Sequence, residues 1–243
     1  MRRVSSARVA DLEAPMAPLA GTLRLVVGLA GVAGCLDAVS LARLTGTFVG
    51  FQTGNTVLVG IGVGQGHPGR ALAPAVAVAA YLVGSALVPL VIRGGSTDPT
   101  ISVRRMLGVA TGLLFLNALI VLVGFGFDAP PPTGAGRYAS IVVSAVAMAF
   151  QTPAVRSVNG VAVSSTFSTG MFTRLGQSFA GWHDAGARTR EMDVARVLGA
   201  TIVAFVAGAT LGGLLVEQFG NGAIVAPPIG LLLVTAVLVR PHG

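Results

Sequence analysis

The sequence FQTGNTVLVG, residues 51–60, places a glutamine, two threonines and an asparagine inside a run that is otherwise apolar. Polar groups within a lipid bilayer need partners inside the protein, so they are unusual in a plain membrane helix. A second stretch, FSTGMFTRLG at residues 167–176, repeats part of this pattern. The two stretches raise the question of whether the chain is an inert membrane bundle or moves something across the membrane.

The composition indicates an integral membrane protein. Of the 243 residues, 53% are hydrophobic and only 10% are charged, whereas a soluble domain carries about 25% charged residues. Several apolar runs are long enough to cross a hydrocarbon core of about 30 Å. We therefore expect an all-α fold, a polytopic bundle of transmembrane helices in contact with the lipid bilayer.

The charge pattern favours a membrane topology signal over nucleic-acid binding. The formal net charge is +7, and all sixteen basic residues are arginines scattered between the apolar runs. A stripe that follows phosphates would be clustered, so we expect no nucleic-acid partner. The single cysteine, Cys35, cannot form an intrachain disulfide, and no Cys/His cluster indicates a metal site, so we expect no metal and no other cofactor.

The chain divides into a tail and one membrane domain. Residues 1–21 are predicted to be a cytoplasmic N-terminal tail, and residues 22–240 form the membrane domain. Turn residues such as those of DAPPPTGAG, residues 128–136, separate the apolar runs. Six runs are predicted to be full spans: 23–44, 71–92, 106–127, 138–155, 194–216 and 223–239.

Two further runs differ from the spans, and we call residues 48–64 the first polar segment and residues 161–180 the second polar segment. Each begins with polar and β-branched residues, reaches a Thr-Gly pair and continues with helical spacing. Non-helical backbone at membrane depth is tolerated only where protein or a water-filled cavity satisfies it. We therefore interpret both as re-entrant or broken segments.

The two halves of the chain form a weak internal repeat. Aligning residues 35–67 on residues 151–183 places the two Thr-Gly pairs on each other, and the order helix, polar segment, helix, helix also repeats. Repeat one is residues 22–127 and repeat two is residues 138–240.

The number of spans decides how these repeats are related. Eight spans would make the repeats parallel, whereas six spans plus two broken segments would invert one repeat relative to the other. With a cytoplasmic N-terminus, six spans place Arg93, Arg104 and Arg105 inside. We therefore favour six plus two, with an inverted repeat.

Two blocks of sequence resemble the signatures of a known family. AGCLDAVSLARLTGTFVGFQTGNTVLVGIGV, residues 33–63, and QTPAVRSVNGVAVSSTFSTGMFTRLGQSF, residues 151–179, are similar to the YoaK-like family of uncharacterised bacterial membrane proteins. This chain has Thr152-Pro153 where we expect asparagine in the second signature. The resemblance implies a polytopic inner-membrane protein of unknown activity, sometimes supposed to be a transporter, and implies no substrate.

Asp37 is the only acidic residue well inside an apolar run. A charge at the centre of a membrane helix costs about 2.5–3.5 kcal/mol on insertion scales, so Asp37 should pair, protonate or face water. One interpretation is a coupling site for an ion or proton. The other is a salt bridge to Arg43, Arg156 or Arg174 that holds helices together.

The two polar segments are the candidate binding elements. Gly54 is expected to permit an unusual backbone angle, so that the following half-helix directs its N-terminal N–H groups at a polar or anionic solute. The alternative is that these side chains only hydrogen-bond neighbouring helices. The candidate solute-binding residues are Gln52, Thr53, Gly54, Asn55, Thr56, Ser165, Thr166, Ser168, Thr169, Gly170 and Thr173.

Three other polar residues are assigned simpler roles. Arg174 could meet an anionic solute or extend to the cytoplasmic surface, and Arg156 is expected to anchor the end of a span. Asn117, in the run GLLFLNALI, is predicted to hydrogen-bond a neighbouring helix.

No enzymatic constellation is visible, because the sequence lacks a phosphate-binding loop, a zinc-protease motif and paired carboxylates. We expect a secondary transporter or permease for a small polar or anionic solute in the bacterial cytoplasmic membrane. The alternative is a non-transporting membrane protein that binds a partner or serves as an assembly subunit. The sequence is also compatible with a homo-oligomer.

Overall fold

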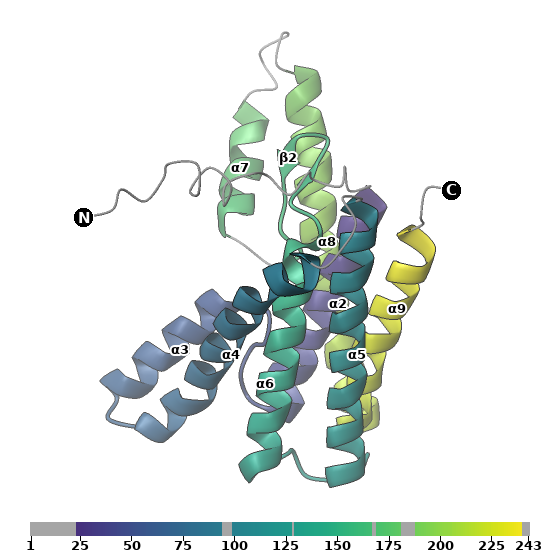
Figure 1. Ribbon diagram of the computed structural model, residues 1–243. Coiled ribbons are helices and arrows are strands. Elements are labelled where there is room, and N and C mark those ends of the chain that lie inside the picture. The colour runs from purple at the N-terminus through teal and green to yellow at the C-terminus, as the bar shows by residue number, and fades with distance from the viewer. Residues whose placement is uncertain (1–22, 94–98, 128, 167–168, 181–187, 240–243) are drawn as a thin grey trace, which may run out of the picture.

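The structure, a computed structural model, is built almost entirely of helices (Figure 1). It describes residues 23–93, 99–127, 129–166, 169–180 and 188–239, so the predicted tail lies outside the described residues. The elements are α2 (Leu23–Val39), the π-helical turn η1 (Ser40–Leu44), α3 (Gln52–Gly64), α4 (Pro68–Arg93), α5 (Pro99–Phe125), α6 (Gly134–Gln151), the 3₁₀ turn η2 (Thr152–Ala154), β1 (Ser157–Val158), β2 (Val161–Ala162), α7 (Thr169–Ala180), α8 (Arg188–Phe219), the 3₁₀ turn η4 (Gly220–Val225) and α9 (Ala226–Leu238).

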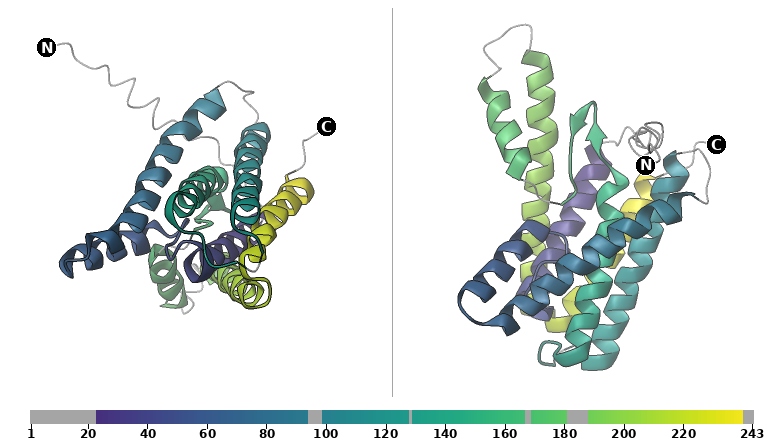
Figure 2. Two further views of the ribbon diagram at one scale, coloured as in Figure 1. Left: turned by 90° about the horizontal axis from the view of Figure 1, so that it is seen from below. Right: turned by 60° about the vertical axis from the view of Figure 1, so that its left-hand side comes forward.

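Helices α2, α5, α6, α8 and α9 form an upright bundle, and the α3–α4 hairpin projects from its side (Figures 1 and 2). In the view of Figure 1, α2, α5 and α8 run downward and α6 and α9 run upward. Helix α2 packs against α8 and α9, while α6 packs between α4 and α5. Leu29 and Leu36 of α2 are fully buried, whereas Val123 and Val203 on outward faces are 78% and 67% exposed. Large apolar side chains on the outside are expected of a bundle surrounded by lipid.

The contact between α2 and α8 is made through glycines. A Cβ atom added at Gly208 would overlap the carbonyl oxygen of Gly31, and one added at Gly34 would overlap that of Phe205. A Cβ added at Gly212 would lie 2.6 Å from the carbonyl oxygen of Cys35. Small residues thus bring the two backbones into direct contact, as in many membrane helix pairs.

The chain reverses direction after α2. Residues 45–51 are not helical, and Gly46 has a φ of +67°, a conformation that side chains with a Cβ rarely adopt. The buried Ser40 hydroxyl donates to the carbonyl of Thr47 at 3.0 Å, and the Arg137 side chain donates to the carbonyl of Thr45. These hydrogen bonds satisfy carbonyl groups that are not paired within a helix or a sheet. From the lower end of α2 in Figure 1, this segment brings the chain back up to about half the height of the bundle, where α3 begins.

A second interruption follows α6. Pro153 lies in the turn η2, and β1 and β2 then form a short antiparallel hairpin. Its turn residues, Asn159 and Gly160, both have positive φ, as a tight hairpin turn requires. Residues 163–166 have no regular structure, and α7 begins at Thr169. The described part of the second polar segment is therefore a strand and four non-helical residues, together with a short helix.

The all-α prediction is confirmed apart from this hairpin, and both predicted polar segments contain short helices preceded by non-helical chain. By length and apolar composition alone, four described stretches could cross a membrane: Leu23–Leu44, Pro68–Ile92, Thr100–Phe125 and the 51-residue stretch Arg188–Leu238 that contains α8 and α9. The structure thus supports a multi-helix membrane bundle.

One backbone prediction is wrong. Gly54 does not have an unusual backbone angle, because it lies inside the first turn of α3, and the break falls earlier, at residues 45–51. A Cβ added at Gly54 would lie 2.6 Å from the ring of Phe51. Glycine is required here because it leaves space for that ring.

Candidate functional site

Asp37 lies in the last turn of α2, beside the N-terminal end of α3. Its Oδ1 accepts hydrogen bonds from the backbone N–H groups of Val49, at 2.8 Å, and Gly50, at 2.7 Å. The N–H of Phe51 also interacts with this carboxylate. Since these residues immediately precede α3, the carboxylate occupies the position where a helix N-terminus attracts an anion. In this structure the protein's own aspartate provides that anion.

The second carboxylate oxygen of Asp37 has no hydrogen-bond partner among the described residues, although Asp37 is only 3% exposed. It faces Gly50, where an added Cβ would lie 3.1 Å from Oδ2, 3.1 Å from Cε of Met148 and 3.3 Å from Cγ2 of Thr166. Gly50 belongs to the first interruption and Thr166 to the second. The non-helical segments of the two halves therefore meet beside the carboxylate.

Asn55 is completely buried, and its side chain holds the preceding loop. Its Oδ1 accepts from the Thr47 hydroxyl and from the Phe48 N–H at 3.1 Å. Its Nδ2 donates to the Phe48 carbonyl at 2.8 Å and to Oε1 of Gln52 at 3.0 Å. All these partners lie within residues 47–52, so the hydrogen-bonding capacity of Asn55 is used to shape its own segment.

The remaining candidates of the first polar segment divide into two groups. Gln52 donates from Nε2 to the carbonyl of Val49 at 2.7 Å and so also holds the loop. Thr53 and Thr56 are exposed on α3, and the Thr56 hydroxyl donates to the carbonyl of Gln52 at 3.0 Å. Their role in binding a solute stays a prediction.

The candidates of the second polar segment lie around the start of α7. The hydroxyls of Ser164 and Thr166 are 3.0 Å apart, and the buried Ser165 hydroxyl has no hydrogen-bond partner within the described part of the chain. Thr169 and Gly170 are exposed in the first turn of α7, and Thr173 donates to the carbonyl of Thr169 at 3.3 Å. Ser168 lies outside the described residues.

The arginines predicted as partners of Asp37 do not form that salt bridge. Arg174 pairs with Glu191 instead, through two contacts of 2.9 Å each. Arg43 donates to Asn221 and to the carbonyl of Ala129, and Arg156 is exposed. Arg43 and Arg174 are held by these other partners, and Oδ1 of Asp37 accepts from the backbone N–H groups of Val49 and Gly50 instead.

Sequence reasoning missed a second polar cluster, at the lower end of the bundle in Figure 1. Asn221, fully buried in η4, accepts from Nε of Arg43 at 3.1 Å and donates to the carbonyls of Gly126 and Ala129 at 3.0 and 3.2 Å. From the turn between α8 and α9, Asn221 thus ties η1 to the chain between α5 and α6. An asparagine next to glycine normally signals only a turn, so the sequence carried no signal for this contact.

Two further polar contacts join helices inside the bundle. Asn117 donates to the Ser144 hydroxyl at 2.8 Å, which confirms the predicted hydrogen bond between helices. Gln151 is also fully buried, and it donates to the carbonyl of Leu29 at 2.9 Å. This contact fastens the end of α6 to α2.

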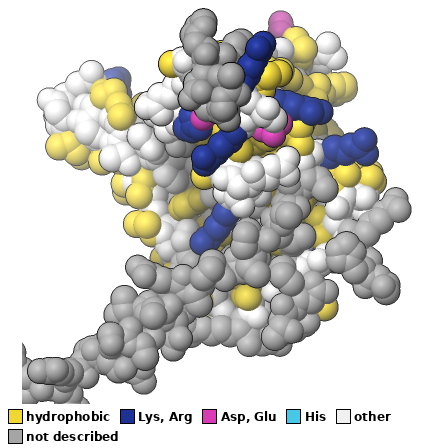
Figure 3. All heavy atoms as spheres, turned by 90° about the horizontal axis from the view of Figure 1, so that it is seen from above, with side chains coloured by type: hydrophobic (Ala, Val, Ile, Leu, Met, Phe, Trp, Pro, Cys, Tyr) yellow, Lys and Arg dark blue, Asp and Glu magenta, His cyan; other side chains and the backbone are white. Residues whose placement is uncertain are grey.

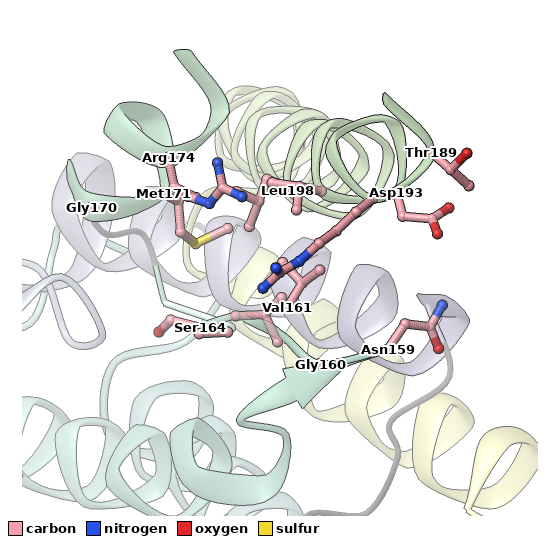
Figure 4. Close-up of a pocket in the computed structure, with 14 residues that line it drawn as sticks. Asn159, Gly160, Val161, Ser164, Gly170, Met171, Arg174, Thr189, Asp193 and Leu198 are labelled. Atoms are coloured by element: carbon pink, nitrogen blue, oxygen red, sulfur yellow. The ribbon is translucent and has the colours of Figure 1, made fainter. Parts of the chain in front are cut away.

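A cavity of ≈ 720 Å³ lies between the β1–β2 hairpin, α7 and the first turns of α8 (Figure 4). Gly170 and Arg174, both predicted site residues, line it together with Arg190 and Asp193. Asn55 lines none of the described cavities and is sealed by its own loop. A candidate solute space thus lies next to the second polar segment, whereas the polar centre of the first segment is closed around Asn55.

The described residues contain no group of three or more His, Cys, Asp and Glu side chains able to hold a metal ion. The candidate site consists of a buried carboxylate, two non-helical segments that meet beside it, and a cavity lined by arginines. These groups can form hydrogen bonds and ion pairs. These features, with apolar helices on all sides, define the class as a helical membrane protein.

The chain belongs to the family described as "Protein of unknown function (DUF1275)", whose model matches residues 25–237. It is also similar to the UPF0700 transmembrane protein RA0705 of Rhizobium meliloti (strain 1021), with 28% identity over 214 residues, or 88% of this chain and 84% of that protein. No solved structure matches the chain significantly. The resemblance to an uncharacterised family of membrane proteins is therefore confirmed.

Proposed function

We propose that this protein is a secondary transporter or permease that moves a small polar or anionic solute across the bacterial cytoplasmic membrane. The observation that carries the proposal is the meeting of the two non-helical segments, at Gly50 and Thr166, beside the buried carboxylate of Asp37. Broken segments from corresponding positions of two halves mark the solute and ion sites of many transporters. Asp37 is the candidate coupling residue.

The packing of the helices supports an inverted repeat of residues 22–127 and 138–240. Helix α2 packs on α8, the helix after the second interruption, and α6 packs on α4, the helix after the first. Likewise α3 packs on α4, and α7 packs on α8. Because α2 runs downward and α6 upward in Figure 1, the reciprocal contacts fit a two-fold relation in the membrane plane. The crossings would then be α2, α4, α5, α6, α8 and α9.

The arginines support a cytoplasmic upper end. Figure 3 shows basic side chains gathered on the face seen from above. Cytoplasmic ends of membrane helices carry an excess of basic residues, so this face would lie inside the cell together with the N-terminus. The arginines at this end lie at the starts of α2, α5 and α8, just before β1 and in the second polar segment. They are Arg24, Arg104, Arg105, Arg156, Arg174, Arg188, Arg190 and Arg196.

The second candidate function is a non-transporting subunit that binds a partner. The complete internal satisfaction of Asn55 favours it, because a residue that holds its own loop has no free group for a solute. Under this alternative the polar segments would only shape the bundle.

A flux assay in proteoliposomes tests the proposal. The purified protein is screened against labelled small carboxylates, phosphate, sulfate and neutral polar solutes, with empty liposomes as the blank. Asp37→Asn keeps an acceptor oxygen for Val49 and Gly50 and should therefore keep the fold. A coupled transporter should lose uphill accumulation in this variant but keep downhill exchange, whereas a pore should keep its full flux. Absence of flux for every solute would favour the non-transporting alternative.

A further inference from the structure

The two halves of the molecule differ at one decisive position. In the first half, the carboxylate of Asp37 meets the N–H groups ahead of α3. The alignment of the two halves pairs Asp37 with Pro153, so the second half has no carboxylate at the corresponding position. The structure has, beside α7, the cavity lined by Gly170, Arg174 and Arg190.

We infer that this cavity binds a small organic anion, whose acid group pairs with the arginines that line the cavity. The inference rests on the proposed function, because it makes the cavity the cytoplasmic loading site of the transport path. It also narrows the solute from polar or anionic to a small organic acid.

The charges that line the cavity favour an anion. Arg174 and Arg190 contribute two positive charges, and Asp193 contributes one negative charge. Figure 4 shows Arg174 directed between α7 and Leu198, whereas Asp193 lies at the opposite end of the cavity, nearer Asn159. A ligand that places its acid group at the Arg174 end would avoid the aspartate.

Arg174 is already oriented for a carboxylate. Its two Nη atoms contact the two oxygens of Glu191, each at 2.9 Å, while the arginine side chain is still 38% exposed. A planar guanidinium binds carboxylates through such paired contacts. The acid group of a ligand could displace Glu191 and accept hydrogen bonds from the same two Nη atoms of Arg174. Glu191 thus competes with the ligand and holds the arginine in place when no ligand is bound.

The floor of the cavity favours an apolar body on the ligand. Met171, Val194 and Leu198 are buried there and form one apolar cluster, against which Val161 and Val163 pack. An inorganic anion would leave these side chains uncovered. An acid with a compact apolar group would satisfy both the arginines and the floor.

Calorimetric titration in lipid nanodiscs tests the inference without any membrane gradient. Benzoate is the probe, and benzamide, of the same shape without charge, is its control. In phosphatidylcholine discs we expect benzoate to bind and benzamide to fail. Arg190→Gln and Arg174→Gln should each weaken benzoate binding by roughly tenfold or more, since each removes a charged donor. Arg196→Gln, on the same helix but outside the cavity lining, is the matched control and should bind as the wild type does.

Variants at two acidic residues should strengthen benzoate binding, whereas the arginine variants weaken it. Glu191→Gln releases Arg174 and should tighten benzoate binding, which a general loss of folding cannot do. Asp193→Asn removes the negative charge from the lining and should also tighten binding. Thermal unfolding of each variant shows whether it is folded.

Several results would overturn the inference. They are no binding of benzoate, equal binding of benzamide, or equal effects of the Arg190 and Arg196 variants. Loss of benzoate binding in discs that contain phosphatidylglycerol, at a salt concentration that screens the surface charge, would assign the cavity to lipid and would also overturn the inference. The flux assay is separate: benzoate binding that depends on Arg190, without flux of any solute, would count against transport and not against the binding site.

Discussion

The replacement Asn55→Ala separates the structural role of this residue from a role in binding. Asn55 makes three hydrogen bonds to residues 47 and 48, all away from solvent. At about 0.6 kcal/mol for each hydrogen bond in a membrane protein, their loss costs about 2 kcal/mol. The buried hydroxyl of Thr47 and the N–H of Phe48 would also lose a partner, which raises the cost to about 3 kcal/mol.

Thermal unfolding of the purified protein in detergent measures this cost. For a chain of this size, about 3 kcal/mol lowers the midpoint by roughly 6–12 °C. Thr56→Ala is the control, because it removes a hydroxyl from an exposed position of the same helix and should change the midpoint little. If both variants have the same midpoint, residue 55 does not hold the loop. A normal midpoint combined with lost flux would instead show Asn55 to be a solute ligand.

Two further variants test the packing of the bundle. Gly208→Ala should separate α2 from α8 at Gly31 and lower the thermal midpoint strongly, whereas Gly213→Ala, which has open space, should leave it nearly unchanged. Equal midpoints would contradict the backbone contact. Asn221→Ala should cost about 2 kcal/mol, since it removes the acceptor of Arg43 and several loop hydrogen bonds, and should expose the α5–α6 loop to protease. Unchanged proteolysis would show that Asn221 does not hold this loop.

The helices were predictable because their signals are local. Apolar runs bounded by glycine and proline give the approximate positions of α2, α4, α5, α6, α8 and α9. The isolated Asn117 was also interpretable, since a polar side chain within an apolar helix needs a neighbour and Ser144 provides it. Such inferences require only the chemistry of one segment.

The exact break in the first polar segment was not predictable. The sequence offers two Thr-Gly pairs, at residues 45–46 and 53–54, with the same local preferences. The first becomes the break because Arg137 bonds to Thr45 and because Asp37 binds the N–H groups of residues 49 and 50. These contacts come from elsewhere in the fold, and one sequence does not reveal them.

The candidate site was predictable only in part for the same reason. Asp37 and the two polar segments were identified by their chemistry, and the structure brings them together at Gly50 and Thr166. The partners of the arginines were not identified. Arg43 and Asn221 are 178 residues apart in the sequence, and Arg174 of α7 meets Glu191 of α8.

The direct backbone contact between α2 and α8 limits which parts of the molecule can move. Where Gly31 meets Gly208, no side chain lies between the two backbones, so a slide of either helix would drive the neighbouring side chains into the facing backbone. The pair should behave as a fixed frame throughout any transport cycle. Distances between spin labels on these two helices should stay constant under all conditions, and any conformational change should be seen only in distances from this frame to the α3–α4 hairpin or to α7.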